Sequence, residues 1–164
     1  MIMTEDICYR LMCEDEIPET SMLVSRVFNR FIAPLFPEEG IREFRAYIRP
    51  DAFHRRVLDG SITYIAEHDG VIIGAIHVRS CSHVSLLFVH EKWQGHGIAH
   101  ELFSRALAHC LEQAPGTGRM TVNSSPNSVQ FYQRLGFTET GHEERRNGIR
   151  FIPMELNLER LAKQ

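Results

Sequence analysis

The sequence predicts one α+β domain with a mixed β-sheet built on a strand–turn–helix unit. A chain of 164 residues has the length of a single domain, and its 43% hydrophobic and 24% charged residues are typical of a folded globule. After Ser61 the hydrophobic pattern changes from helical spacing to β-branched and aromatic runs. One such run, His83–Val89, is almost continuously apolar and leads through a glycine-containing turn into an amphipathic helix.

The first third of the chain is predicted to be mainly helical. A short, weakly apolar strand at Ile7–Cys13 precedes a helix that Pro34 ends. The helical pattern has mixed three- and four-residue spacings and comprises Ser21, Met22, Val24, Phe28, Phe31 and Ile32. Pro34–Gly40 is predicted to be a loop. Two short helices follow at Ile41–Ile48 and Pro50–Leu58, the second with proline just inside its start.

The middle of the chain is predicted to form the strand–turn–helix unit. Ile62–Ala66 and Val71–Val78 are strands, and the turn His68-Asp-Gly70 joins them as a hairpin. After the buried strand His83–Val89, the next helix repeats apolar residues over four turns until Pro115-Gly116 stops it. Its apolar residues are Ile98, Ala99, Leu102, Phe103, Ala106, Leu107, Cys110 and Leu111.

The last third is predicted to add strands and one short helix. Arg119–Asn123 is a strand, and Ser125 caps a helix that carries Pro126 at its first position and ends at Gly136. A strand begins at Phe137, and Asn147-Gly148 is the turn into a final strand, Ile149–Leu156. Because proline cannot donate a ladder hydrogen bond, we expect a bulge or a free edge at Pro153.

Composition excludes some classes of protein. A net charge of -3 argues against a nucleic-acid binder, which needs an excess of Lys and Arg. No apolar run approaches the roughly 20 residues that span a bilayer, so no membrane partner is expected. The amino terminus has no secretory pattern. Cys8, Cys13, Cys81 and Cys110 are too sparse for a disulfide framework, so we expect small, buried or half-buried side chains and a reducing cytoplasm.

The junction between the apolar strand and the amphipathic helix is the best candidate for a binding site. A helix amino terminus exposes unpaired N–H groups, and Gly95 and Gly97 would let a phosphate approach them. A tight turn without a ligand is the alternative. The P-loop pattern is absent, and His100 stands where a dinucleotide-binding turn has its third glycine.

Two stretches in this order resemble the GNAT superfamily of N-acetyltransferases. The segment Gln94-Gly-His-Gly97-Ile-Ala99 is similar to the family signature Gln/Arg-x-x-Gly-x-Gly/Ala. The later stretch from Asn123 to Phe137, which ends in Phe-Tyr-Gln-Arg-Leu-Gly-Phe, is similar to the family's strand, Asn-containing turn and helix. The resemblance runs from about Ser61 to Leu156, and the whole chain, 1–164, is expected to be one such domain.

The resemblance implies a fold, a cosubstrate and a set of contacts. The sheet would have six to seven strands with about four helices beside it, and acetyl-CoA would lie where His83–Val89 and Arg119–Asn123 splay apart. The expected coenzyme A contacts are the backbone of Phe88 and Val89, the amides of Gln94, Gly95, His96, Gly97, Ile98 and Ala99, and the side chains of Asn127 and, in a supporting role, Asn123.

The resemblance also implies catalytic roles. Tyr132 matches the tyrosine that protonates the departing thiolate, and the chemistry needs such an acid together with help for the oxyanion. The strand that often carries a glutamate base has none here, so His83 is the first candidate for the base, with His77 as a further candidate and Glu67 behind them. His96 and His100 are four residues apart without a third ligand, so no metal is expected.

The function predicted is acetyl transfer from acetyl-CoA to a primary amine by direct attack in a ternary complex. No acyl-enzyme motif is visible. A catalytically silent, coenzyme A-binding sensor of the same fold is the alternative. The acceptor would be a small-molecule or peptide amine, and the acidic residues Glu38, Glu39 and Glu43 would suit a cationic one. Relatives often dimerise through a terminal strand, so a homodimer is compatible with the sequence, which does not decide it.

Overall fold

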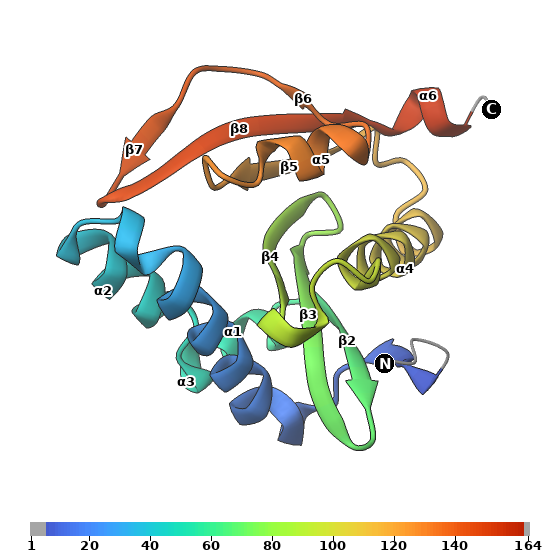
Figure 1. The fold of residues 1–164 in the computed structure, drawn as a ribbon. Coiled ribbons are helices and arrows are strands. Elements are labelled where there is room, and N and C mark those ends of the chain that lie inside the picture. Colours follow the sequence, from blue (N-terminus) through green and yellow to red (C-terminus); the bar gives the residue numbers. More distant parts are fainter. Residues whose placement is uncertain (1–5, 163–164) are drawn as a thin grey trace.

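A computed structural model describes residues 6–162, which form a mixed β-sheet with helices on both faces (Figure 1). The eight strands run in the order β1-β2-β3-β4-β5-β8-β6, and β7 pairs with β8. They are β1 (Cys8–Leu11), β2 (Ile62–His68), β3 (Val71–Arg79), β4 (His83–Val89), β5 (Arg119–Ser124), β6 (Thr138–Glu139), β7 (Glu144–Arg146) and β8 (Ile149–Asn157). The α+β fold and mixed sheet are confirmed, with more strands than the six to seven expected.

Only the β4–β5 pair is parallel among the strand pairs of the described residues. The helices are α1 (Ile17–Phe31), α2 (Glu38–Tyr47), α3 (Pro50–Leu58), α4 (Ile98–Gln113), α5 (Val129–Arg134) and α6 (Leu158–Ala162). Single 3-10 turns lie at η2 (Glu14–Glu16), η3 (Ala33–Leu35) and η4 (Glu91–Trp93). In Figure 1, α1, α2 and α3 lie on one side of β3 and β4, and α4 lies on the other.

A separate hydrophobic core fills each face of the sheet. On one face, Leu102, Phe103 and Ala106 of α4 pack with Ile76 and with buried residues of the other strands. On the other face, the helices α1 and α3 and the end of α2 supply a second core, which packs against β2, β3 and β4. Its buried residues are Ile17, Leu23, Val24, Val27, Phe28, Ile48, Phe53, Ile65, Ile72, Ala75, Leu86 and Phe88. The sheet is therefore covered on both sides, as the apolar β4 sequence predicts.

The helix α1 begins before the first residue of the predicted helical pattern, and two residues of that pattern are exposed. It starts at Ile17, with Pro18 in its first turn, and buries Thr20, Val24 and Val27. Together with the buried Ile17, these residues are spaced three, four and three positions apart, which places them on one face of the helix. Of the residues in the predicted helical pattern, Met22 is 73% exposed and Phe31 is 39% exposed, whereas Val24 and Phe28 are buried.

Helix boundaries differ from the prediction where turn chemistry competed with helix formation. The helix α2 includes Glu38 and Glu39, which were predicted to lie in a loop, because Pro37 serves as its N-cap. The helix α5 begins only at Val129, because Ser125 closes a turn with Ser128 instead of capping the helix. The helix α6 was not predicted at all.

The two predicted hairpin turns are present, and both require left-handed backbone. Asp69 and Gly70 have φ values of 49° and 78°, and Asn147 and Gly148 have 52° and 81°. Pro153 pairs with Asn123 of β5 without a register shift and has Thr140 on its other side, so the bulge or free edge predicted at this proline is absent. Its carbonyl accepts a hydrogen bond from the Thr140 amide, so its nitrogen also points away from β5 and no ladder donor is lost there.

Other predictions concern the cysteines and the chain ends. All four cysteines are free thiols, but only Cys110 is buried, Cys81 is half-buried, and Cys8 and Cys13 are exposed. Residues 1–5, on which the prediction of no secretory signal depends, lie outside the described residues. No helix within residues 6–162 is long and apolar enough to cross a membrane.

Gly40 and Gly148 bring α2 and the β7–β8 turn into backbone contact. A Cβ on Gly40 would lie 2.3 Å from the Gly148 oxygen, and a Cβ on Gly148 would lie 2.4 Å from the Gly40 nitrogen. Only glycine therefore permits this contact.

We expect Gly40→Ala to lower the free energy of unfolding by about 1–3 kcal/mol, because the backbones must separate to admit the methyl group. Urea unfolding measures the change. Gly116→Ala is the matched control, because a Cβ there meets nothing within 4 Å, and it should change stability by less than about 0.5 kcal/mol. Equal effects of the two substitutions would contradict the close contact.

Candidate active site

The site begins where β4 and β5 separate. The two strands pair only at His83 with Thr121 and at Val84 with Val122. Immediately afterwards β4 contains a β-bulge, because Val78 of β3 opposes Val84 whereas His77 opposes Leu86, which leaves Ser85 as the extra residue. A bulge bends its strand and increases the local twist. The predicted splay of these two strands is therefore present, and the bulge accounts for its position.

A cavity of about 340 Å³ opens beside the separated strands. Its volume is in the range of sites for small molecules. One wall is aromatic: Phe28 stacks on Phe44 with ring centroids 4.0 Å apart, and Phe44 lies 5.9 Å from Phe88. The opposite side is formed by residues of β5, α5 and the β7–β8 hairpin, among them Asn123, Tyr132 and Phe151.

The edge of β4 that faces the gap offers free backbone groups. The His90 amide donates to the Ile73 carbonyl on the β3 side, and strand residues alternate in the direction of their backbone groups. The backbone N–H and C=O groups of Leu87 and Val89 thus point toward the gap, whereas those of Phe88 point toward β3. This corrects the expected role of the Phe88 backbone, although the Phe88 side chain does line the cavity. The Val89 carbonyl already accepts a hydrogen bond of 2.9 Å from Gln94 Nε2.

The turn from β4 into α4 is held open by two glycines. Gly95 and Gly97 have φ values of 80° and 77°, and Gly97 is the N-cap residue of α4. A Cβ on either would meet nothing within 4 Å, so the backbone conformation, and not crowding within the protein, requires glycine here. The helix α4 has 16 residues, and its first amides face this open turn without a side-chain cap. Such a turn can bind an anion through backbone N–H groups.

His83 lines the cavity at the point where the strands part. Its Nδ1 lies 2.8 Å from the Thr121 hydroxyl, which donates its own proton to the Ser82 carbonyl at 3.3 Å. With the hydroxyl proton on the Ser82 carbonyl, the matching tautomer has Nδ1 as the donor in the first bond and a lone pair on Nε2. Burial, with the nearby charge of Arg79, lowers the pKa of His83 to about 4. The imidazole is neutral at pH 7.

Tyr132 also lines the cavity and is 7% exposed. Its ring packs edge-on against Phe131 and Phe137, with centroids 5.2 and 5.5 Å away. Burial raises the pKa of its phenol, so the hydroxyl keeps its proton at neutral pH. A buried, protonated phenol at the edge of a cavity can donate a proton or a hydrogen bond to a group bound there.

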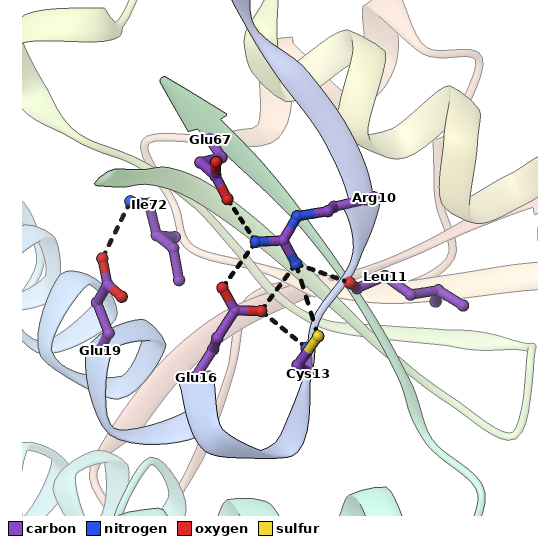
Figure 2. Close-up of polar contacts among 7 residues, drawn as sticks. All are labelled: Arg10, Leu11, Cys13, Glu16, Glu19, Glu67 and Ile72. Atoms are coloured by element: carbon purple, nitrogen blue, oxygen red, sulfur yellow. Dashed lines mark hydrogen bonds and ion pairs between the residues drawn. The ribbon is translucent and has the colours of Figure 1, made fainter. Parts of the chain in front are cut away.

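His77 and Glu67, the other candidates for a base, are engaged elsewhere. His77 is 1% exposed, accepts a hydrogen bond from Arg56 Nε at 3.3 Å, and packs on Phe53. Burial, with Arg56 and Arg79 nearby, lowers the pKa of His77 to about 3. Glu67 forms an ion pair with Arg10 (Figure 2). Neither side chain lines the cavity.

Figure 2 shows that the Arg10 guanidinium also holds Glu16 through two hydrogen bonds of 2.8 Å. The pKa of Glu16 is lowered to about 2, mainly by its hydrogen bonds with Arg10. In the same view Glu19 accepts a hydrogen bond from the Ile72 amide. These contacts fix η2 and the start of α1 against β2 and β3, and they have a structural role.

The two asparagines occupy different surroundings. Asn123, on β5, lines the cavity. Asn127 lies in the turn before α5, and its Oδ1 accepts a hydrogen bond of 2.8 Å from the Ser125 hydroxyl. The side chain of Asn127 is exposed and not part of the cavity wall.

His96 and His100 belong to no group of three closely spaced metal-ligating side chains within residues 6–162. His96 Nδ1 lies 2.9 Å from the Gln94 carbonyl, and both His96 and His100 are exposed. Within residues 6–162, the group spaced closely enough for a metal is Cys13, Asp15 and Glu16, at the Arg10 end of the sheet. Glu16 is already held by Arg10 there.

The cavity wall also contains three arginines that were not predicted from the sequence. Arg79, Arg146 and Arg150 line the cavity together with Glu43. Glu38 and Glu39 do not line it, so the proposed acidic surface at the opening is reduced to one carboxylate. No sequence signal reveals these arginines as a group, because they come from three strands, and β3 is far in the chain from β7 and β8.

Comparisons with known proteins agree on the fold. The family model described as "Acetyltransferase (GNAT) domain" matches residues 32–158. A GNAT structure from Rhodopseudomonas palustris superposes with a TM-score of 0.78 at 22% identity, covering 96% of this chain and 98% of its own. No curated protein matches the sequence.

Two further solved structures are similar over nearly the full chain. The PaiA N-acetyltransferase of Thermoplasma acidophilum, in complex with coenzyme A, has a TM-score of 0.75 at 16% identity, with 92% of this chain and 98% of that one covered. A spermidine N-acetyltransferase chimera from Vibrio cholerae has a TM-score of 0.68 at 14% identity, with coverage of 97% and 99%. At these identities the likeness concerns the fold.

The neutral state of His83 has a consequence for stability. Its pKa of about 4 in the fold lies below the ordinary value of 6.5, so between these pH values the unfolded chain binds a proton that the folded chain does not. Stability should therefore fall as pH decreases through this window. His77 acts in the same direction.

We expect His83→Asn to lose less stability than the wild type between pH 6.5 and 4, by roughly 1 kcal/mol after partial solvent screening. Urea unfolding at several pH values measures this difference. If both proteins lose stability equally with acidification, His83 is not kept neutral by its surroundings.

Proposed function

The chain belongs to the GNAT acetyltransferase family, and we propose that it acetylates a small-molecule primary amine by direct attack on acetyl-CoA in a ternary complex. The observation that carries this proposal is the cavity beside the separated strands β4 and β5. It has His83 at the point of separation and Tyr132 in the opposite wall. The whole chain, 1–164, would act as one domain.

Coenzyme A would lie along β4 and across the glycine turn. The pantetheine arm is an extended chain with amide groups, and the edge of β4 at Leu87 and Val89 has backbone groups that could bind it as an added strand. The pyrophosphate would be bound by the amides of residues 94–99 at the start of α4. Asn123 would contact the arm from the cavity wall, and Asn127 would do so by exchanging its contact with Ser125.

The acceptor is proposed to be a small molecule because the cavity is small, at about 340 Å³. Two of the similar structures support an amine as acceptor, since one is described as a spermidine N-acetyltransferase and the other as an N-acetyltransferase bound to coenzyme A. Neither identifies the amine that this chain uses.

The chemistry follows from the groups around the cavity. The amine nitrogen attacks the thioester carbonyl, the new C–N bond forms, and the C–S bond breaks. His83 Nε2, with its free lone pair, would accept the proton that the amine loses, directly or through water. The amide of Val89 or Leu87 would stabilise the oxyanion. Tyr132 would give its proton to the departing thiolate.

Coenzyme A binding tests the glycine turn. A side chain at Gly97 would force the left-handed backbone to change and would fill the space in front of the amides. We expect Gly97→Val to weaken coenzyme A binding, measured by calorimetry, at least tenfold.

Gly60→Val is the matched control. Gly60 also has a positive φ, 96°, and open space around it, but it lies in the turn between α3 and β2. This variant should keep the wild-type affinity even where stability falls. If folded Gly97→Val binds coenzyme A with unchanged affinity, the pyrophosphate does not bind at this turn.

The role of Tyr132 is tested by removing its hydroxyl. Tyr132→Phe keeps the ring packing against Phe131 and Phe137. It should lower kcat and kcat/KM together by at least tenfold, with little change in acetyl-CoA affinity, because the proton is needed only in the transition state. The loss should be smaller for thioesters of more acidic thiols.

Steady-state kinetics with a competent acceptor measure both effects. Normal turnover by Tyr132→Phe would exclude the tyrosine as the acid. If the wild type binds coenzyme A tightly but acetylates no amine in a broad screen, a catalytically silent module of this fold is favoured instead.

A further inference from the structure

The charged groups in the cavity wall are mostly positive. Arg79, Arg146 and Arg150 face Glu43 as the only carboxylate among the lining residues. The positive charge of Arg150 is compensated by Glu143, because Nε and Nη2 of Arg150 donate to the two carboxylate oxygens at 3.1 and 3.0 Å. Arg79 and Arg146 form no ion pair within residues 6–162. The cavity therefore has two uncompensated guanidinium groups.

Arg146 is held in a position suited to a ligand. Its guanidinium carbon lies 5.4 Å from the centre of the Phe151 ring, and Phe151 is buried in the cavity wall. The hairpin that carries Arg146 is fixed to α2 by the Gly40–Gly148 contact and by a bond from Asn147 Nδ2 to Glu43. An arginine on a rigid hairpin with its donors free can bind a carboxylate through two parallel hydrogen bonds.

The phosphates of coenzyme A do not account for these arginines. In the proposed complex the pyrophosphate lies at residues 94–99, and none of these residues lines the cavity. Arg146 lies on the β7–β8 hairpin, which contacts α2, and Arg79 ends β3 opposite His83. We assign this part of the cavity to the acceptor.

We propose that the acceptor is a zwitterionic amine, in which a carboxylate lies close to the amino group and an apolar or aromatic body completes the molecule. This inference rests on the proposed function. Arg146, assisted by Arg79, would bind the carboxylate, and the single carboxylate of Glu43 matches the ammonium form that first enters. A polyamine, with positive charges only, would meet two uncompensated guanidinium groups and is disfavoured.

The apolar part of the wall defines the body of the acceptor. Phe28, Phe36, Phe44 and Phe88 form one aromatic surface, and the buried hydroxyl of Tyr47 has no hydrogen-bond partner within the described residues. The cavity must also admit the acetyl end of the cosubstrate, so the body is about the size of one amino-acid side chain.

The test compares ligands that differ only in the carboxylate. L-phenylalanine and 2-phenylethylamine have the same body and amine, as do L-leucine and 3-methylbutylamine. Calorimetry on protein saturated with coenzyme A measures their binding without turnover. We expect at least one of the two amino acids to bind at least tenfold tighter than its decarboxylated partner.

Arg146→Gln should remove this preference and leave the affinity of the plain amine within twofold. Arg145→Gln is the matched control, because Arg145 precedes Arg146 on β7, is exposed, and does not line the cavity. It removes the same charge and should leave the preference intact. If both variants lose the preference for the amino acid equally, the preference depends on net charge alone, and the proposal is overturned.

Release of free thiol from acetyl-CoA separates this inference from the proposed function. Binding preference with no thiol release supports the carboxylate site but contradicts the acetyltransferase proposal. If the plain amines cause thiol release and the amino acids do not bind better, the acetyltransferase proposal is supported and the carboxylate site is contradicted. If neither amino acid binds better than its amine, the zwitterionic acceptor is excluded.

Discussion

The structure depends on the loss of pairing between β4 and β5. An inner strand of a sheet normally has its backbone groups bonded on both sides, and unbonded buried groups are costly. Here the parallel ladder ends after Val84, and the bulge at Ser85 turns β4 away. Beyond the bulge, the backbone groups on this edge of β4 need hydrogen-bond partners other than β5. The Gln94 side chain satisfies the Val89 carbonyl, and this bond also fixes the start of the glycine turn. The rest of the edge is available for a ligand with amide groups.

Contacts between distant segments set the width of the cavity. The backbones of α2 and the β7–β8 turn meet at Gly40 and Gly148, two residues more than 100 positions apart in the chain. A second cross-connection pairs Arg26 of α1 with Glu91 beside the glycine turn, at 2.6 Å. Because Arg26 is more than half exposed, this pair adds little stability, but it links α1 to the same turn. The helices of the amino-terminal third thereby define one wall of the site.

Local patterns in the sequence were sufficient for most of the fold. The strand His83–Val89, the helix Pro50–Leu58 and the two hairpin turns follow from periodicity and turn chemistry, which act over a few residues. The apolar pattern of α1 did not show which of its residues are buried: Met22 and Phe31 are exposed, and only tertiary contacts decide this. The start of α5 was misjudged because Ser125 had two local partners, and the one in the turn prevailed.

The candidate site was predictable only in part, for the same physical reason. The glycine turn and the tyrosine are parts of short motifs, so sequence spacing identifies them. The arginines in the cavity are brought together by the sheet order, in which β8 lies beside β5 and carries β7 with it. No local pattern in the sequence predicts that arrangement of strands.

The two proposals assign the binding of anions to two different kinds of group near the same cavity. The glycine turn has few cations, with Lys92 beside it, and must rely on backbone amides, which cannot distinguish one phosphate ester from another. The cavity instead has guanidinium groups, whose planar donors match the geometry of a carboxylate. Amides are suited to a cosubstrate shared by a whole family, because they do not depend on side chains. Arginines on a separate hairpin can be substituted without disturbing that turn, so in this proposal the hairpin would set the selectivity for the acceptor.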